Sequence, residues 1–104
     1  MSLEFFAPQA ARELERAVAQ IAESNPAAAE AFLRTALAAA TRIASRPGLG
    51  SVRPHLPSRY RFWPLTRYSY LLVYDATTDP ALILRVVHMR RDLPKLLSDV
   101  PPQR

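Results

Sequence analysis

The sequence predicts an α+β domain in which an N-terminal helical hairpin packs on a small antiparallel sheet, in the order β-α-α-β-β-β-α. Apolar residues in the first half recur with the 3.6-residue period of a helix, whereas those in the second half alternate as in strands. A stretch that holds both glycines separates the two halves. The chain has 104 residues, the length of one domain, and we expect a single domain over 1–104 with a loose tail at 99–104.

The first half predicts two helices after a short strand at Phe5 and Phe6. Residues 10–21 place their apolar side chains on one helix face and their charged ones on the other. Asn25 suits the N-cap of a second helix and Pro26 its first turn, so this helix begins almost where the first one ends. So short a break predicts an antiparallel hairpin.

The second half predicts three strands and a short final helix. Pro64 should close the first strand, and the third strand is apolar on both faces except at Arg85 and His88, which favours a central place in the sheet. Short turns between the strands predict an antiparallel meander whose free face presents arginines. The predicted strands cover 60–63, 67–74 and 81–89, and the helix, capped by Asp92, runs through Leu96 and Leu97.

Composition excludes several classes of protein. The absence of cysteine excludes disulfides, thiol nucleophiles and zinc–thiolate sites. The two histidines and scattered aspartates show no ligand spacing, so we expect no metal and no cofactor. No apolar run reaches the length of about 18–20 residues that a membrane span needs, and the N-terminus lacks the order of a secretory signal. These features predict a cytoplasmic protein that does not enter a membrane.

The positive charge is concentrated in the second half. Residues 46–104 hold nine arginines and one lysine against four aspartates, a surplus of six, whereas four arginines face five glutamates in residues 1–45. Such a field attracts nucleic acid or an acidic protein segment. Arginine, which supplies nearly all of the cations, binds phosphate and carboxylate with two parallel hydrogen bonds. A basic composition without function is the alternative interpretation.

Several side chains are candidates for partner or nucleic-acid binding. Arg59, Arg61 and Trp63 alternate along one strand and should share a face, although a solvated edge would give the same pattern. Arg85 either contacts an anionic partner or forms a structural pair, for example with Asp75 or Asp92. His88 is either a general acid at a strand end or a structural residue. The full candidate set is Arg59, Arg61, Trp63, Arg67, Arg85, Arg90 and Arg91.

Local motifs in their order along the chain resemble the RelE/ParE family of type II toxin–antitoxin toxins. The likeness runs over roughly residues 4 to 97. The matching stretches are residues 10–21, Asn25-Pro26-Ala27-Ala28, Ile43-Ala44-Ser45-Arg46-Pro47, Arg53-Pro54, Arg67-Tyr68, Leu72-Val73-Tyr74, Ile83-Leu84-Arg85-Val86-Val87-His88 and Arg90-Arg91-Asp92. The resemblance implies a toxin that a cognate antitoxin neutralises, and it leaves open whether the toxin forms a homodimer.

The family has two branches, and the sequence is more similar to the ParE branch, which implies inhibition of DNA gyrase without established catalytic residues. RelE-like members are ribosome-dependent endoribonucleases that cleave mRNA, and Arg61, Arg85 and His88 would be the catalytic candidates if the chain belonged there. Against that branch, the chain has one lysine, Lys95, no glutamate after Glu30 and no tyrosine after His88. A non-toxic module that only binds antitoxin is a third alternative.

Overall fold

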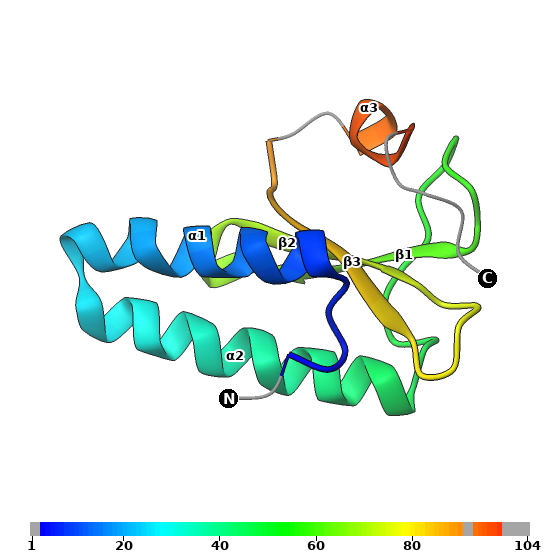
Figure 1. The fold of residues 1–104 in the computed structure, drawn as a ribbon. Helices are drawn as coiled ribbons and strands as arrows, with labels where there is room; N and C mark the ends of the chain where they lie inside the picture. The colour runs from blue at the N-terminus through cyan, green and yellow to red at the C-terminus, as the bar shows by residue number, and fades with distance from the viewer. Residues whose placement is uncertain (1–2, 91–92, 99–104) are drawn as a thin grey trace.

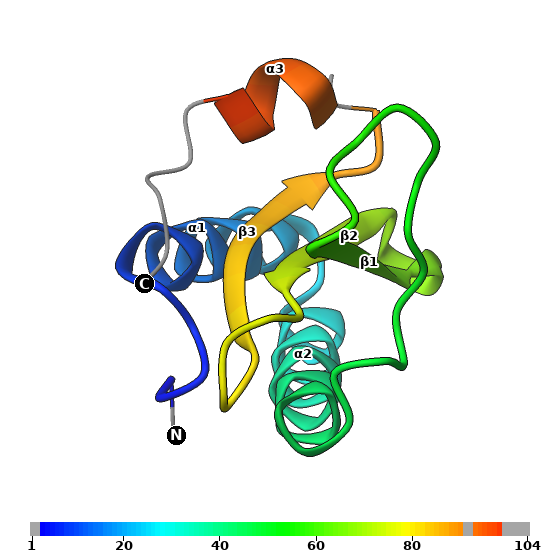
Figure 2. The same ribbon diagram turned by 90° about the vertical axis from the view of Figure 1, so that its right-hand side faces the viewer.

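The fold, obtained as a computed structural model, joins a helical hairpin to a three-stranded antiparallel sheet (Figure 1). The structure describes residues 3–90 and 93–98. The predicted tail at 99–104, Arg91 and the predicted cap Asp92 lie outside these residues. Two long helices cover one face of the sheet and a short third helix lies on the other (Figure 2). The predicted α+β class is therefore confirmed.

Both helices of the hairpin begin with a proline and pack on the sheet through small residues. Helix α1 spans Pro8–Ser24 and α2 spans Pro26–Ser45. Asn25 caps α2 as predicted, because its side-chain oxygen accepts a hydrogen bond from the Ala28 amide at 3.1 Å. The buried side chains are Ala10, Leu14 and Ala17 in α1 and Ala29, Phe32, Ala36, Ala39, Ala40 and Ile43 in α2. Alanine at so many buried positions lets the two helices approach each other closely.

The sheet contains β1 (Tyr60–Leu65), β2 (Tyr70–Asp75) and β3 (Leu82–His88) in the order β1-β2-β3. The 3₁₀ turn η1, Thr66–Tyr68, joins β1 to β2, and Ser69 follows it in the left-handed conformation at φ 59°. β2 therefore starts three residues later than the predicted strand.

Two expectations about the strands were wrong. Pro64 does not close β1, which continues to Leu65. The amide and the carbonyl of Phe62 point away from β2 and pair with Ser51. Pro64 lies two residues further along and therefore faces the same way. The sheet needs no N–H donor on that side, so the missing N–H of proline does not end the strand. β3 is an edge strand rather than the central one. It is apolar on both faces because packed layers lie on both sides of the sheet.

The predicted N-terminal strand is reduced to a single parallel bridge between Phe6 and Ile83. The Ile83 amide donates to the Phe5 carbonyl, and its carbonyl accepts from the Ala7 amide, each at 2.8 Å. This short contact satisfies the outer edge of β3 near its start, where an unpaired edge would otherwise be exposed.

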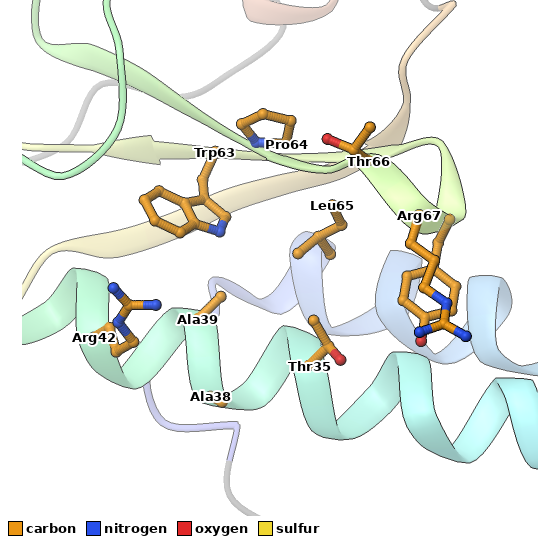
Figure 3. A pocket seen from close by; sticks show the side chains of 10 residues that line it. Thr35, Ala38, Ala39, Arg42, Trp63, Pro64, Leu65, Thr66 and Arg67 are labelled. Atoms are coloured by element: carbon orange, nitrogen blue, oxygen red, sulfur yellow. The ribbon is translucent and has the colours of Figure 1, made fainter.

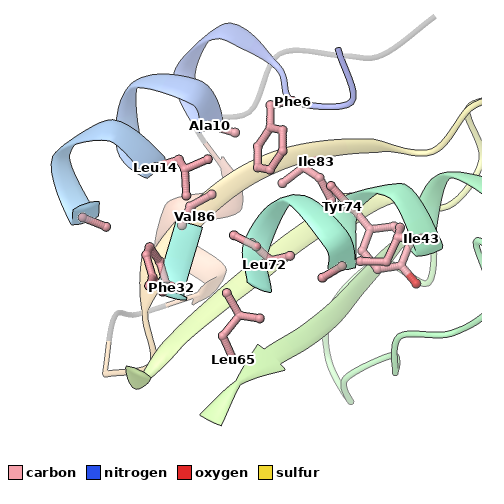
Figure 4. Close-up of a cluster of buried hydrophobic side chains, with 14 of the residues drawn as sticks. Phe6, Ala10, Leu14, Phe32, Ile43, Leu65, Leu72, Tyr74, Ile83 and Val86 are labelled. Atoms are coloured by element: carbon pink, nitrogen blue, oxygen red, sulfur yellow. The ribbon is translucent and has the colours of Figure 1, made fainter. Parts of the chain in front are cut away.

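We predicted that the face of the sheet away from the hairpin presents arginines, but that face is apolar. The main core lies between the hairpin and the face of the sheet that points toward it, around Phe32, Leu72 and Tyr74 (Figure 4). Helix α3, Leu93–Ser98, covers the outer face with Leu93 and Leu97. The outer cluster also contains Phe62, Leu71, Val73 and Val87. No helix within the described residues is both long and apolar enough to cross a bilayer.

Candidate functional site

A groove of about 440 Å³ lies between α2 and the segment that leaves β1 (Figure 3). We call it the α2–β1 groove. Side chains of α2 form one wall and the unpaired side of β1 with η1 forms the other. It is lined by Thr35, Ala38, Ala39 and Arg42 on the helix and by residues 63–68 on the strand and turn. Two predicted partner residues, Trp63 and Arg67, therefore lie in one groove.

The α2–β1 groove combines a small apolar floor with positive charge and an aromatic ring. The Arg42 guanidinium lies over the Trp63 ring, 5.5 Å from its centroid, which is a cation–π arrangement. Arg67 adds a second exposed cation, and none of the lining residues is acidic. Ala38 and Ala39 leave room for a bulky side chain from a partner. An apolar segment that carries carboxylates has the matching chemistry.

The free edge of β1 is poorly suited to pairing with another strand. The backbone of Phe62 already pairs with Ser51 through hydrogen bonds of 2.9 and 3.1 Å. Pro64 has no amide hydrogen to offer at the next outward position. The outer edge of β1 therefore offers few free backbone groups for extension of the sheet.

Arg59 is part of a structural ion pair. Its Nη2 donates to the Asp75 carboxylate at 2.5 Å, and Asp75 is fully buried. Asp75 also accepts the Thr77 amide at 2.9 Å and the Thr77 hydroxyl at 2.6 Å. Burial alone would raise the pKa of Asp75, but the hydrogen bonds from Arg59 and Thr77 hold that pKa below its usual value. The same pair raises the pKa of Arg59.

Arg61 holds the loop that follows α2. Its Nη1 donates to the Gly50 carbonyl at 2.7 Å. The buried Tyr74 hydroxyl donates to the Pro47 carbonyl and accepts from the Gly50 amide, both at 2.7 Å. Burial raises the pKa of this Tyr74 hydroxyl. Arg61 and Tyr74 therefore hold the loop against the sheet from two sides.

Arg85 forms a buried pair with Glu13 of α1 rather than with the expected Asp75. Its Nε and Nη2 donate to the Glu13 carboxylate at 3.0 and 2.7 Å. The other carboxylate oxygen accepts the Val86 amide at 2.8 Å. The two side chains are only 7% and 13% exposed. Asp92, the second expected partner, is outside the described residues.

His88 is exposed at the end of β3 and stands apart from the other two endoribonuclease candidates. Its ring meets the edge of Tyr70, with centroids 5.6 Å apart, and its Nδ1 accepts the Arg90 amide at 3.3 Å. Arg61 contacts the loop after α2, and Arg85 contacts α1. The structure therefore does not bring Arg61, Arg85 and His88 together. Arg90 is exposed, and Arg91 lies outside the described residues.

Sequence reasoning missed the helical wall of the α2–β1 groove. Thr35, Ala38 and Arg42 belong to the helical half, where the sequence pointed to no candidate binding residue. The available signal was the small Ala38 between Thr35 and Arg42 on one helix face, because an alanine there leaves space beside a cation. Among the described residues, no cluster of three potential metal ligands occurs.

The described residues combine a hairpin-covered sheet with a groove that holds two arginines and a tryptophan. A family profile described as "ParE toxin of type II toxin-antitoxin system, parDE" matches residues 5–93. The chain therefore belongs to the ParE toxin family of type II toxin–antitoxin systems, and an antitoxin is its implied partner.

Solved structures agree on the fold. A structure titled "Chromosomal ParDE TA system from P. aeruginosa" matches with a TM-score of 0.67 and 17% sequence identity. The match covers 80% of this chain and 90% of that one. Among curated protein sequences, no significant match was found.

Proposed function

We propose that this toxin inhibits DNA gyrase in the cytoplasm by binding it, without a catalytic centre of its own, and that its antitoxin keeps it inactive. Membership of the ParE family supports this target, since the sequence resembles the branch whose members act on gyrase. One structural observation supports the proposal that the toxin acts without catalysis. Arg61 donates a hydrogen bond to the Gly50 carbonyl, and Arg85 donates two to the Glu13 carboxylate. Neither guanidinium is free to stabilise a phosphate beside His88.

A supercoiling assay tests the gyrase proposal. Purified gyrase with relaxed plasmid, ATP and equimolar toxin should supercoil more slowly and accumulate cleaved DNA, whereas the toxin–antitoxin complex should have no effect. Unimpaired supercoiling would contradict the proposal. Cleavage of ribosome-bound mRNA by the toxin, abolished in His88→Ala, would instead assign the endoribonuclease function.

We further propose that the antitoxin occupies the α2–β1 groove through an acidic amphipathic segment. Arg42 and Arg67 supply cations, and Trp63 with Ala38 and Ala39 supplies the apolar surface that such a segment would cover. The weak capacity of β1 for strand pairing favours recognition by side chains over sheet extension. A negative charge introduced on the helical wall of this groove should therefore weaken antitoxin binding.

A further inference from the structure

A second hollow, between α1 and the end of β3, contains hydrogen-bond donors that the fold does not use. We call it the α1–β3 hollow; its volume is about 320 Å³. Arg16 and Gln20 of α1 line it together with Tyr70 and His88 of the sheet. In the part of the chain that the structure describes, the side chains of Arg16 and Gln20 and the Tyr70 hydroxyl have no hydrogen-bond or ion-pair partner. Their donors are available to a ligand.

The polar groups of the α1–β3 hollow are arranged to receive an anion. His88 accepts the Arg90 amide at Nδ1, which leaves the ring proton of a neutral imidazole on Nε2. Glu13 is the one acidic residue in the lining, and its carboxylate already accepts hydrogen bonds from Arg85 and from the Val86 amide. The other polar side chains of the lining, Arg16, Gln20, Tyr70 and His88, can therefore offer donors to the hollow, and the one carboxylate of the lining is paired with Arg85.

We propose that the α1–β3 hollow binds a backbone phosphate of a nucleic-acid strand. A single arginine can satisfy the two coplanar oxygens of a carboxylate by itself. Here the donors come from a helix on one side and from two strands on the other. Donors that approach from several directions match the diverging oxygens of a tetrahedral phosphate better than a planar carboxylate. The volume fits one phosphate with its sugar and is too small for a duplex.

This site is separate from the α2–β1 groove. The two linings share no residue, and Phe32 lies between them, with its ring 5.1 Å from that of Tyr68 in the groove and 5.3 Å from that of Tyr70 in the hollow. Phosphate binding can therefore be measured without gyrase and without antitoxin. Its failure would leave the proposed toxin function unaffected.

The test is the affinity of the full chain for a short fluorescent single-stranded DNA, measured by anisotropy over a range of salt concentrations. Arg16→Gln should weaken binding about tenfold and lower the log–log salt slope by about one. Arg12→Gln, which removes an equally exposed cation one turn earlier on α1, should change affinity less than about twofold. Equal losses in the two variants would indicate diffuse charge attraction and would overturn the proposal.

A second pair of variants tests the geometry without changing charge. Tyr70→Phe removes one hydroxyl from the hollow and should weaken DNA binding about fivefold, whereas Tyr68→Phe should not. Both substitutions keep the ring that packs on Phe32. An RNA strand of the same sequence should depend on Arg16 and Tyr70 in the same way, and any preference between the strands identifies the source of the phosphate. Binding of a poly-glutamate peptide that needs Arg16, with no binding of either strand, would contradict the proposal.

Discussion

Two carboxylates, the fully buried Asp75 and the largely buried Glu13, pair with arginines of the second half. Glu13 accepts hydrogen bonds from two nitrogens of Arg85 and from the Val86 amide. Asp75 accepts bonds from the Arg59 guanidinium and from both the amide and the hydroxyl of Thr77. A buried charge is tolerated only when it is paired and hydrogen-bonded in this way. Arg59 and Arg85 therefore form ion pairs within the fold, and partner binding by either of them stays a prediction.

The Glu13 contact should be among the most important single interactions for stability. Glu13→Ala leaves the Arg85 guanidinium and the Val86 amide without this acceptor, and we expect the free energy of unfolding to fall by about 3–5 kcal/mol. Urea denaturation followed by circular dichroism measures this change. Glu15→Ala, on the exposed side of the same helix, should stay within about 0.5 kcal/mol of the parent. A loss below about 1 kcal/mol for Glu13→Ala would show that the pair contributes little.

At the scale of elements, the loop after α2 shows why the residue pattern alone could not tell which glycine the fold requires. The sequence predicted a loop there because two glycines and several prolines occur together, but it did not distinguish the roles of the glycines. An added Cβ at Gly50 would lie 2.7 Å from the Tyr74 hydroxyl and 2.8 Å from Cε1 of the same ring. At Gly48 the same atom would meet nothing within 4 Å. The difference arises from Tyr74, which is distant in sequence.

The two glycines make a matched pair for a stability measurement. Gly50→Ala should lower the free energy of unfolding by about 1–3 kcal/mol, because the buried Tyr74 ring must move and lose its bond to the Gly50 amide. Gly48→Ala should be neutral or stabilising by up to about 1 kcal/mol, since its backbone φ is not positive and its surroundings are open. Thermal unfolding of both variants compares them. Equal melting temperatures would contradict the role given to Tyr74.

The helices could be predicted from sequence more closely than the sheet, for a physical reason. Helix boundaries depend on local signals, and Asn25 with Pro26 marked the start of α2 directly. The place of β3 at the sheet edge depends on distant contacts, namely the bridge from Phe6 to Ile83 and the cover that α3 provides. An apolar strand with such cover has the same sequence pattern as a central one.

At the scale of the whole molecule, the charge surplus of the second half overstated the cationic surface available to a partner. Three arginines of that half, Arg59, Arg61 and Arg85, already donate hydrogen bonds to groups of the fold. Of the cations that line the α2–β1 groove, Arg67 comes from the second half, but Arg42 comes from the helical half, where the sequence pointed to no candidate binding residue. A site built from both halves is visible only after the hairpin has packed beside the sheet.

The most direct test of the α2–β1 groove as the recognition surface is the affinity of the toxin for its antitoxin. Calorimetry measures this affinity for two variants that each gain one negative charge. Ala38→Glu places a carboxylate on the helical wall of the groove and should weaken binding about tenfold or more through repulsion of an acidic segment. Ala19→Glu changes an exposed alanine of α1 outside the groove and should leave the affinity unchanged. If both chains bound antitoxin as tightly as the parent, or lost affinity equally, the groove would not be the antitoxin site.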